Sequence, residues 1–252
     1  MGMNNVSVFD EILGNMGEID DSYDLYFVVT PFGTHKSVLD KILSYKNKKV
    51  WCEKPLVDNV KDALYLYNKA RENGNILFVD WIYTFNKGIE RIKNIISSKK
   101  IKFILLNRTN DGPARNDCTS VEDLSVHDLS ILYYLFGSDE VLDFQWNEFS
   151  IKNHEKFGSN ISHCYFDGTQ IIINSSWQHK HKNRVSIFVT DDDEMITFDD
   201  KNKLVLTKDE VFLDESSPLQ NAIDFFIKNQ SFPDNMEITF RITENIERYK
   251  GK

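Results

Sequence analysis

The chain has 252 residues, of which 41% are hydrophobic and 27% charged, a composition typical of a globular protein with one large domain or two ordinary ones. The net charge of −9 argues against nucleic-acid binding, because an acidic surface repels phosphates. There is no apolar run of membrane-spanning length and no signal-peptide core in residues 1–20, so we expect no membrane partner. Three scattered cysteines, Cys52, Cys118 and Cys164, suggest neither a disulfide framework nor a metal site and favour a cytoplasmic location.

Strands and helices are predicted to alternate in the first hundred residues. The apolar runs at 25–29, 50–52 and 76–79 are typical of buried strands. Segments 35–47, 60–73 and 85–100 carry apolar residues on one helical face. This alternation indicates an α/β unit with a parallel sheet.

After residue 100 the pattern changes to short runs of alternating polarity separated by turn residues. Eight such runs between residues 102 and 215 predict a mostly antiparallel sheet with one face in water. Helices are predicted at 121–137, 216–230 and 237–250. We therefore expect two domains, residues 1–100 with a parallel sheet and residues 101–252 with an α+β fold.

Lys54 stands at the end of a predicted strand in the segment "KKVWCEKPLVD", residues 48–58. Pro55 restricts the residue before it to an extended backbone, which fixes Lys54 at the strand's carboxyl end. Ligands of open parallel sheets bind at such ends. The alternative is an ordinary solvated lysine.

Asp123 and His127 are four residues apart on a predicted helix, so both side chains are expected on one side of it. A carboxylate beside an imidazole orients the ring and favours its charged form. The alternative is a surface ion pair, or an aspartate that interacts with the helix dipole. Asp128 is expected to face elsewhere, as a structural partner.

Two polar segments are candidates for binding an anionic ligand. Arg108, Asn110 and Arg115 surround a predicted turn at Gly112-Pro113, where arginines suit a phosphate or carboxylate, although a polar surface loop is the alternative. The segment "SSWQHKHKNR", residues 175–184, is a basic and aromatic strand end that contains Trp177 and Lys180. Its histidines lack a third metal ligand, so we expect no metal.

Four segments together resemble one family of enzymes. "VVTPFGTH", "WCEKPL", "VDWIYTFNKGIERIKNI" and "DLSVHDLSILYYLFG" are similar to the glucose–fructose oxidoreductase / inositol dehydrogenase / MocA-like family, and they occur in the family's order. The "EKP" tripeptide followed by an aspartate-x-x-x-histidine is a fairly specific combination. "RTNDGPAR" and "SSWQHKHKNRVSIFV" further resemble members that act on nucleotide-linked sugars in polysaccharide synthesis.

The resemblance implies a Rossmann-like domain that binds NAD or NADP, and a domain with a large open sheet that contacts the sugar substrate and other subunits of a homo-oligomer. A hydride would pass from a sugar carbon to the nicotinamide, and one base must take the hydroxyl proton. The resemblance implies catalytic roles for Lys54, Asp123 and His127, with Lys54 or His127 as the base. The implied cofactor-binding residues are Thr30, Pro31, His35, Glu53 and Lys54, and the implied substrate-binding residues are Arg108, Asn110, Arg115, Trp177 and Lys180.

One feature of the family is not found in the sequence. The family opens with a strand and a G-x-G-x-x-G turn that holds the pyrophosphate, whereas "LGNMG", residues 13–17, is two residues short of that pattern and follows no strand. The chain is expected to start at the family's third strand, which leaves residues 25–29 with an unpaired apolar edge.

Three interpretations follow from the missing turn: a fragment of a longer gene product, a degenerate relative that binds the dinucleotide poorly, or a chain completed by a partner subunit. Two functions therefore stay open. One is an NAD(P)-dependent oxidoreductase acting on a sugar or nucleotide-sugar hydroxyl. The other is a non-catalytic sugar-ligand binder or assembly subunit.

Overall fold

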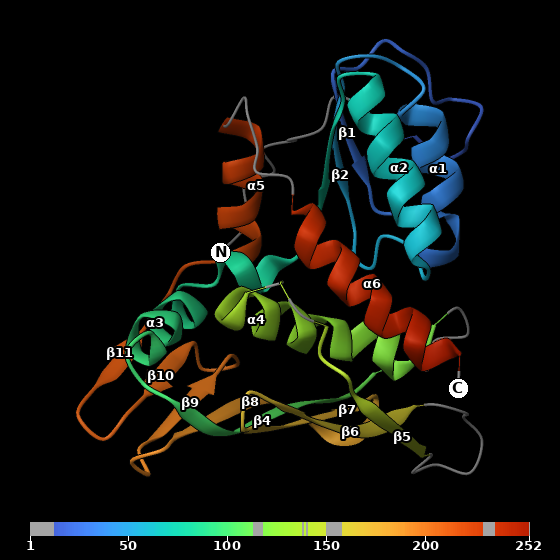
Figure 1. Ribbon diagram of the computed structural model, residues 1–252. Coiled ribbons are helices and arrows are strands. Elements are labelled where there is room, and N and C mark those ends of the chain that lie inside the picture. Colours follow the sequence, from blue (N-terminus) through green and yellow to red (C-terminus); the bar gives the residue numbers. More distant parts are fainter. Residues whose placement is uncertain are drawn as a thin grey trace.

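The computed structural model describes residues 13–112, 118–137, 139, 141–149, 158–228 and 235–251. It contains two sheets with helices packed between and around them (Figure 1). The smaller sheet has three parallel strands in the order β1-β2-β3, namely Leu25–Val28, Lys49–Cys52 and Ile76–Val79. The expected parallel sheet in the first part of the chain is therefore confirmed.

Helices cover both faces of the three-stranded sheet. Alternate residues Tyr26 and Val28 belong to the main core together with side chains of α1 (His35–Ile42) and α2 (Val60–Glu72). On the opposite face, Trp51 and Phe78 pack against Phe226 of α5 (Pro218–Lys228). The period of two residues along each strand explains this division. It also means that α5, which comes late in the sequence, completes the first sheet.

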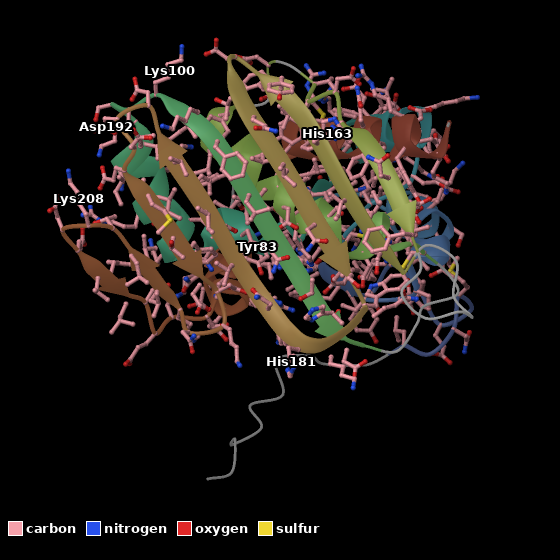
Figure 2. All side chains as sticks on the ribbon, turned by 90° about the horizontal axis from the view of Figure 1, so that it is seen from below. Tyr83, Lys100, His163, His181, Asp192 and Lys208 are labelled. Carbon is pink, nitrogen blue, oxygen red and sulfur yellow. The ribbon has the colours of Figure 1, made fainter. Side chains whose placement is uncertain are left out.

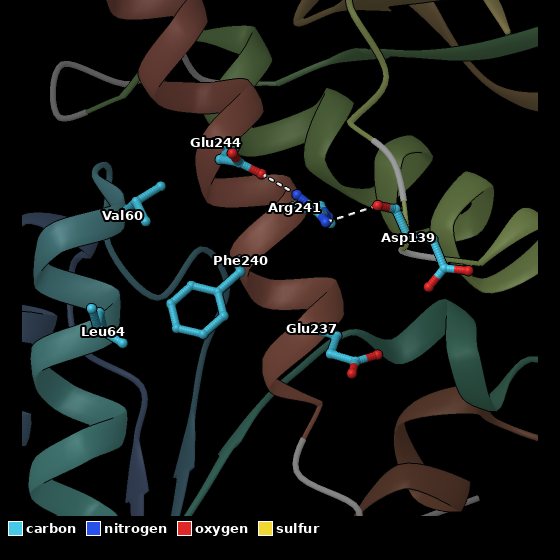
Figure 3. A pocket seen from close by; sticks show the side chains of 7 residues that line it. All are labelled: Val60, Leu64, Asp139, Glu237, Phe240, Arg241 and Glu244. Atoms are coloured by element: carbon cyan, nitrogen blue, oxygen red, sulfur yellow. Dashed lines mark hydrogen bonds and ion pairs between the residues drawn. The ribbon is translucent and has the colours of Figure 1, made fainter.

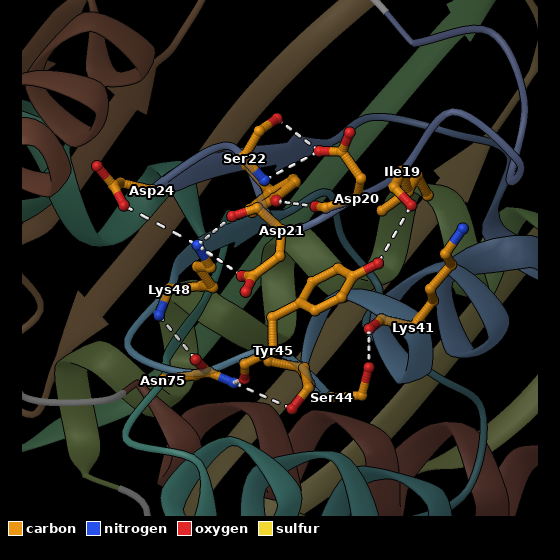
Figure 4. Close-up of polar contacts among 12 residues, drawn as sticks. Ile19, Asp20, Asp21, Ser22, Asp24, Lys41, Ser44, Tyr45, Lys48 and Asn75 are labelled. Carbon is orange, nitrogen blue, oxygen red and sulfur yellow. Dashed lines mark hydrogen bonds and ion pairs between the residues drawn. The ribbon is translucent and has the colours of Figure 1, made fainter.

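The segment before β1 is fixed by polar contacts with the residues around β2 (Figure 4). The Nζ atom of Lys48, which is buried, lies 2.8 Å from Asp21 Oδ1 and donates to the Asp21 carbonyl at 2.9 Å. Tyr45 donates to the carbonyl of Ile19. Within the described residues β1 pairs with β2 alone, so its other edge is the margin of the sheet, as expected from the sequence.

The larger sheet has eight strands in the order β11-β10-β9-β8-β4-β7-β6-β5. The β4 and β7 strands are parallel and all other neighbours are antiparallel, which confirms the predicted mostly antiparallel sheet. In chain order, β4 to β11 are Ile101–Asp111, Gln145–Phe149, Ser159–Phe166, Thr169–Ser176, Gln178–Thr190, Met195–Asp199, Leu204–Leu206 and Val211–Leu213.

Helices α4 (Val126–Phe136) and α6 (Met236–Lys250) lie between the sheets, and α3 (Lys87–Ile96) packs over the β9–β10 end of the large sheet (Figure 1). Trp81 after β3 donates to Thr239 of α6 at 2.9 Å, and Asn245 of α6 donates to Tyr133 of α4 at 2.6 Å. Helix α6 thus binds to both parts of the molecule. The domain boundary expected near residue 100 falls between α3 and β4. The division into residues 1–100 and 101–252 stays a prediction, because α5 and α6 pack on the first part.

Candidate active site

A cleft of about 410 Å³ opens at the carboxyl ends of β1 and β2. Three segments line it. The first is the turn after β1 at residues 29–32, which leads into the short 3₁₀ turn η1 (Phe32–Thr34). The second is the segment at residues 53–55, directly after β2. The third contains Cys118, Glu122 and Asp123, in and before the π-helical turn η3 (Val121–Ser125). This is the position where parallel sheets of this type bind ligands.

A second cleft of about 480 Å³ lies between α2 and α6 (Figure 3). Its apolar side consists of Val60, Leu64 and Phe240. Its central cation, Arg241, donates to Glu244 at 2.8 Å and to the carbonyl of Asp139 at 3.0 Å. It contains none of the residues predicted to be functional, so the cleft at β1 and β2 is the better candidate.

Lys54 and Asp123 meet in the β1–β2 cleft. The ammonium of Lys54 lies 2.9 Å from Asp123 Oδ1 and donates to the Asp123 carbonyl oxygen at 2.6 Å. Their side chains are 12% and 19% exposed, which weakens screening by water and strengthens the pair. The pair joins the end of β2 to η3, 69 residues further along the chain.

The carboxylate of Asp123, on the π-helical turn η3, accepts a hydrogen bond from Lys54. The expected pairing of Asp123 with His127 stays a prediction. His127 lies at the start of α4, with its ring against the edge of Tyr83, 5.5 Å between centroids. Desolvation, followed by the charges of Lys54, Arg108 and Arg184, keeps the pKa of His127 well below its usual range. The imidazole is therefore neutral, not charged as expected from the sequence.

Arg108 was expected to bind an anionic ligand, and the structure places it behind His127 instead. Its side chain is buried, and Nε and Nη2 donate to Asp128 Oδ1 at 3.1 and 2.8 Å. Nη1 donates to the hydroxyl of Tyr83 at 2.6 Å, and that hydroxyl donates to Asp200. Burying the guanidinium requires this pairing. The interpretation of Asp128 as a structural partner is confirmed.

The expected cofactor-binding residues line the cleft. Thr30, Pro31, His35, Glu53 and Lys54 all belong to it. His35 is buried, and its Nδ1 and Nε2 atoms lie 2.9 Å from the carbonyl oxygens of Pro55 and Thr30. The ring therefore links the turn after β1 to the segment after β2 and holds both walls of the cleft together.

The remaining residues of the predicted substrate site do not line the cleft. Trp177 was expected to contact substrate, but it lies between β7 and β8 and is only 3% exposed. Lys180 is exposed on β8 and Asn110 is half-buried on β4. Arg115 lies outside the described residues.

Several cleft residues were missed in the sequence. Val29 and Phe32 flank the Thr30-Pro31 pair, and Cys118 and Glu122 lie within five residues of Asp123. Their nearness to predicted site residues was the available signal.

A buried carboxyl group adjoins the Lys54 end of β2. Asp80 follows β3, is 4% exposed, and its Oδ1 atom has no hydrogen-bond partner among the described residues. Its backbone N–H donates to Cys52 at 2.8 Å, which places it beside Glu53 on the neighbouring strand. Burial, reinforced by the charge of Glu53 and opposed by Lys54, raises the pKa of Asp80 to about 8.

Comparisons with known proteins agree with this geometry. Residues 3–81 match the family described as "Oxidoreductase family, NAD-binding Rossmann fold". Inositol 2-dehydrogenase of Mycolicibacterium gilvum is 30% identical over 126 residues, which are 48% of this chain and 36% of that protein. The chain thus matches only about a third of the length of that relative.

Solved structures share the fold. UDP-N-acetylglucosamine 3-dehydrogenase from Acidithiobacillus ferrooxidans has a TM-score of 0.78 at 18% identity, covering 89% of this chain and 76% of that one. A 3-ketoreductase from Actinomadura kijaniata, in complex with TDP-benzene and NADP, has a TM-score of 0.72 at 14% identity, covering 90% and 77%.

None of the described helices is both long and apolar enough to cross a membrane. The matched residues 3–81, the 30% identical relative and the two-sheet fold together make the chain similar to the glucose–fructose oxidoreductase / inositol dehydrogenase / MocA family of oxidoreductases.

Proposed function

We propose that the protein is an NAD(P)-dependent oxidoreductase that acts on a hydroxyl of a sugar or nucleotide sugar, in a pathway of polysaccharide biosynthesis. One observation carries this proposal. The Lys54–Asp123 pair lies in a cleft at the carboxyl ends of parallel strands, close enough to His127 for the charge of Lys54 to lower its pKa. One solved relative is named as a UDP-N-acetylglucosamine dehydrogenase and another is in complex with TDP-benzene and NADP, which supports the choice of substrate and cofactor class.

The residues of the cleft fit one end of a nicotinamide dinucleotide. Thr30, Glu53 and Lys54 present a hydroxyl, a carboxylate and an ammonium group along its walls, which suit the ribose hydroxyls and the carboxamide of the nicotinamide. When bound, the nicotinamide supplies the acceptor or donor of the hydride.

The protein's own residues would handle the proton and the oxygen. Lys54, held by Asp123 at 2.9 Å, would donate a hydrogen bond to the reacting oxygen and stabilise the negative charge that develops there. His127 is neutral and can accept the hydroxyl proton. Asp123 would fix the ammonium at the end of β2. This division of roles favours His127 over Lys54 as the base.

The test combines cofactor binding with turnover. We expect NAD or NADP to raise the melting temperature, and a panel of sugars and UDP- or TDP-linked sugars to yield a rise in nicotinamide absorbance. Lys54→Met should lower kcat/KM by roughly 10²-fold or more, and the variant should stay folded, with a melting temperature lowered by the loss of the pair with Asp123. Lys208→Met, a lysine far from the cleft (Figure 2), is the matched control. A chain that neither binds millimolar cofactor nor turns over any of these sugars contradicts the proposal.

A second candidate is a sugar-ligand binder or assembly subunit without catalysis. It is favoured by the glycines at 14 and 17, which precede β1 but follow no strand within the described residues, so the described chain offers no glycine-rich turn for a pyrophosphate. This candidate predicts nucleotide-sugar binding that Lys54→Met leaves unchanged, with no turnover.

We further propose a homo-oligomer in the cytoplasm. The outer face of the eight-stranded sheet supports the first part, since Ile161, Tyr165 and Met195 are 44%, 72% and 57% exposed there. Cys52, Cys118 and Cys164 form no disulfide within the described residues, which suits a reducing compartment.

A further inference from the structure

The π-helical turn η3, which carries Asp123, rests on a buried polar side chain of the large sheet. Asn160 of β6 is fully buried, and its Nδ2 atom donates to Ser120 Oγ at 3.3 Å and to Ser125 Oγ at 3.1 Å. Ser120 precedes η3 and Ser125 is its last residue. One amide group therefore contacts both ends of the turn.

The neighbouring strand adds a second contact to the same turn. Ser175 of β7 lies directly opposite Asn160 in the sheet, and its hydroxyl is 2.9 Å from that of Ser125. All four side chains, those of Ser120, Ser125, Asn160 and Ser175, have no exposed surface. The ladder between β6 and β7 thus sets the spacing of the groups that hold η3.

The chemistry of this contact is unusual for a core. Burying an amide and three hydroxyls costs free energy unless each is hydrogen-bonded, and apolar residues of the same size would fill the space at lower cost. The Nδ2 atom of Asn160 and the hydroxyls of Ser120, Ser125 and Ser175 are hydrogen-bonded to one another, whereas Asn160 Oδ1 has no partner among the described residues. Directional bonds of this kind in the core favour one geometry of the turn. π-Helical turns are rare and are frequently found at functional sites.

The opposite side of η3 is held separately. Glu122 accepts from the backbone N–H of Thr119 at 2.8 Å and lies 3.3 Å from the ammonium of Lys250 in α6. Sheet and helix therefore hold the turn from two directions, and Asn160 is the sheet's contact with both ends.

We propose that Asn160 is a positioning residue for the active site: by clamping both ends of η3, it keeps the Asp123 carboxylate on the ammonium of Lys54. The inference rests on the proposed function for the role of Asp123, whereas the clamp itself is a property of the fold. Asn160 touches neither Lys54 nor the cleft, and it acts through η3.

The test measures amide hydrogen exchange by mass spectrometry in peptides covering residues 119–126. Loss of the two hydrogen bonds in Asn160→Ala should speed exchange there by about tenfold, the effect expected for about 1.4 kcal/mol of local stability. Asn245→Ala is the matched control, because Asn245 is also a buried asparagine but donates to Tyr133. It should lower overall stability without a selective change at 119–126. Equal exchange of this segment in both variants would overturn the clamp.

Ser125→Ala provides a second variant that removes one end of the clamp with a smaller change. It should speed exchange in the same peptides, and adding Asn160→Ala to it should have less than the additive effect, because both lose a shared bond. Wild-type exchange in Ser125→Ala would also overturn the proposal, even where Asn160→Ala fails to fold.

Turnover separates this inference from the proposed function. If the wild-type protein oxidises a sugar, Asn160→Ala should lower kcat by about tenfold and leave cofactor binding unchanged, because only the geometry of Asp123 is disturbed. A wild-type protein without turnover would reject the proposed function, while the exchange data would still decide whether Asn160 clamps η3.

Discussion

The pKa values of two side chains beside Lys54 move in opposite directions through burial. The pKa of Asp80 rises to about 8, and that of His127 falls well below its usual range. In each case desolvation disfavours the charged form, which is the carboxylate for Asp80 and the imidazolium for His127. Both groups are therefore neutral near pH 7. Lys54 and Asp123 form a charged pair in the cleft.

Asp80 should make the protein less stable as the pH rises. Its pKa is 3.8 when unfolded and about 8 when folded, so between these values the folded chain holds a proton that the unfolded chain has lost. Stability therefore falls across about pH 4 to 8. Asp80→Asn should be more stable than the wild type at pH 8, by on the order of 1–3 kcal/mol.

Denaturant unfolding of both proteins at pH 5 and pH 8 measures this effect. At pH 5 the gain from Asp80→Asn should be clearly smaller than at pH 8. A gain that is equal at both pH values would show that Asp80 is ionised in the folded chain.

The parts of the site that are determined by residues adjacent in the sequence could be predicted. The strand end at Lys54 follows from Pro55, and the end of α4 from Gly137, which has a φ of 89°. The winding of η3 could not be predicted, because its bonds to Asn160 and Ser175 come from strands that follow it in the sequence. For the same reason Arg108 was predicted to bind an anionic ligand and was not recognised as a buried partner of Asp128.

Arg108 on β4 and Asp128 on α4 form a buried pair. Removing one partner should lower the free energy of unfolding more than replacing both partners with apolar residues. Arg108→Met leaves the buried Asp128 carboxylate unpaired and should lower the free energy of unfolding by about 3–5 kcal/mol. The double variant Arg108→Met/Asp128→Leu should lose markedly less than Arg108→Met alone.

Urea unfolding of the single and double variants forms the required cycle. Lys102→Met, which changes an exposed residue of the same strand, is the control. A loss in the double variant that equals the sum of the losses in Arg108→Met and Asp128→Leu would mean that the pair is not coupled.

At the scale of the molecule, the outer face of the large sheet carries several exposed apolar side chains among polar ones. Strand register places Tyr165, Gln170, Phe103, Val189 and Met195 in one row across five strands. His163, labelled in Figure 2, is on this face between Ile161 and Tyr165. The alternating pattern that predicted this sheet also predicted a face in contact with water. Which residues lie opposite one another on neighbouring strands could be determined only from the structure.

This face should hold two copies of the chain together. Introducing charge with Ile161→Lys/Tyr165→Glu should convert the assembly to a monomer in sedimentation or light-scattering measurements, because a stable interface buries about 1,200–2,000 Å² of well-matched surface. Lys61→Glu, on α2 away from the sheet, should leave the mass unchanged. A wild-type protein that is monomeric at micromolar concentration contradicts the proposed oligomer.

The parallel pairing of β4 with β7 has a consequence for folding kinetics. Phe103 lies opposite Gln170, and η3, α4, β5 and β6 all belong to the intervening chain. Closing so long a loop is entropically costly and slow. The turn η3 therefore lacks its contacts with the sheet until β4, β6 and β7 have paired. During refolding, recovery of ligand binding should lag behind the early helical signal in circular dichroism.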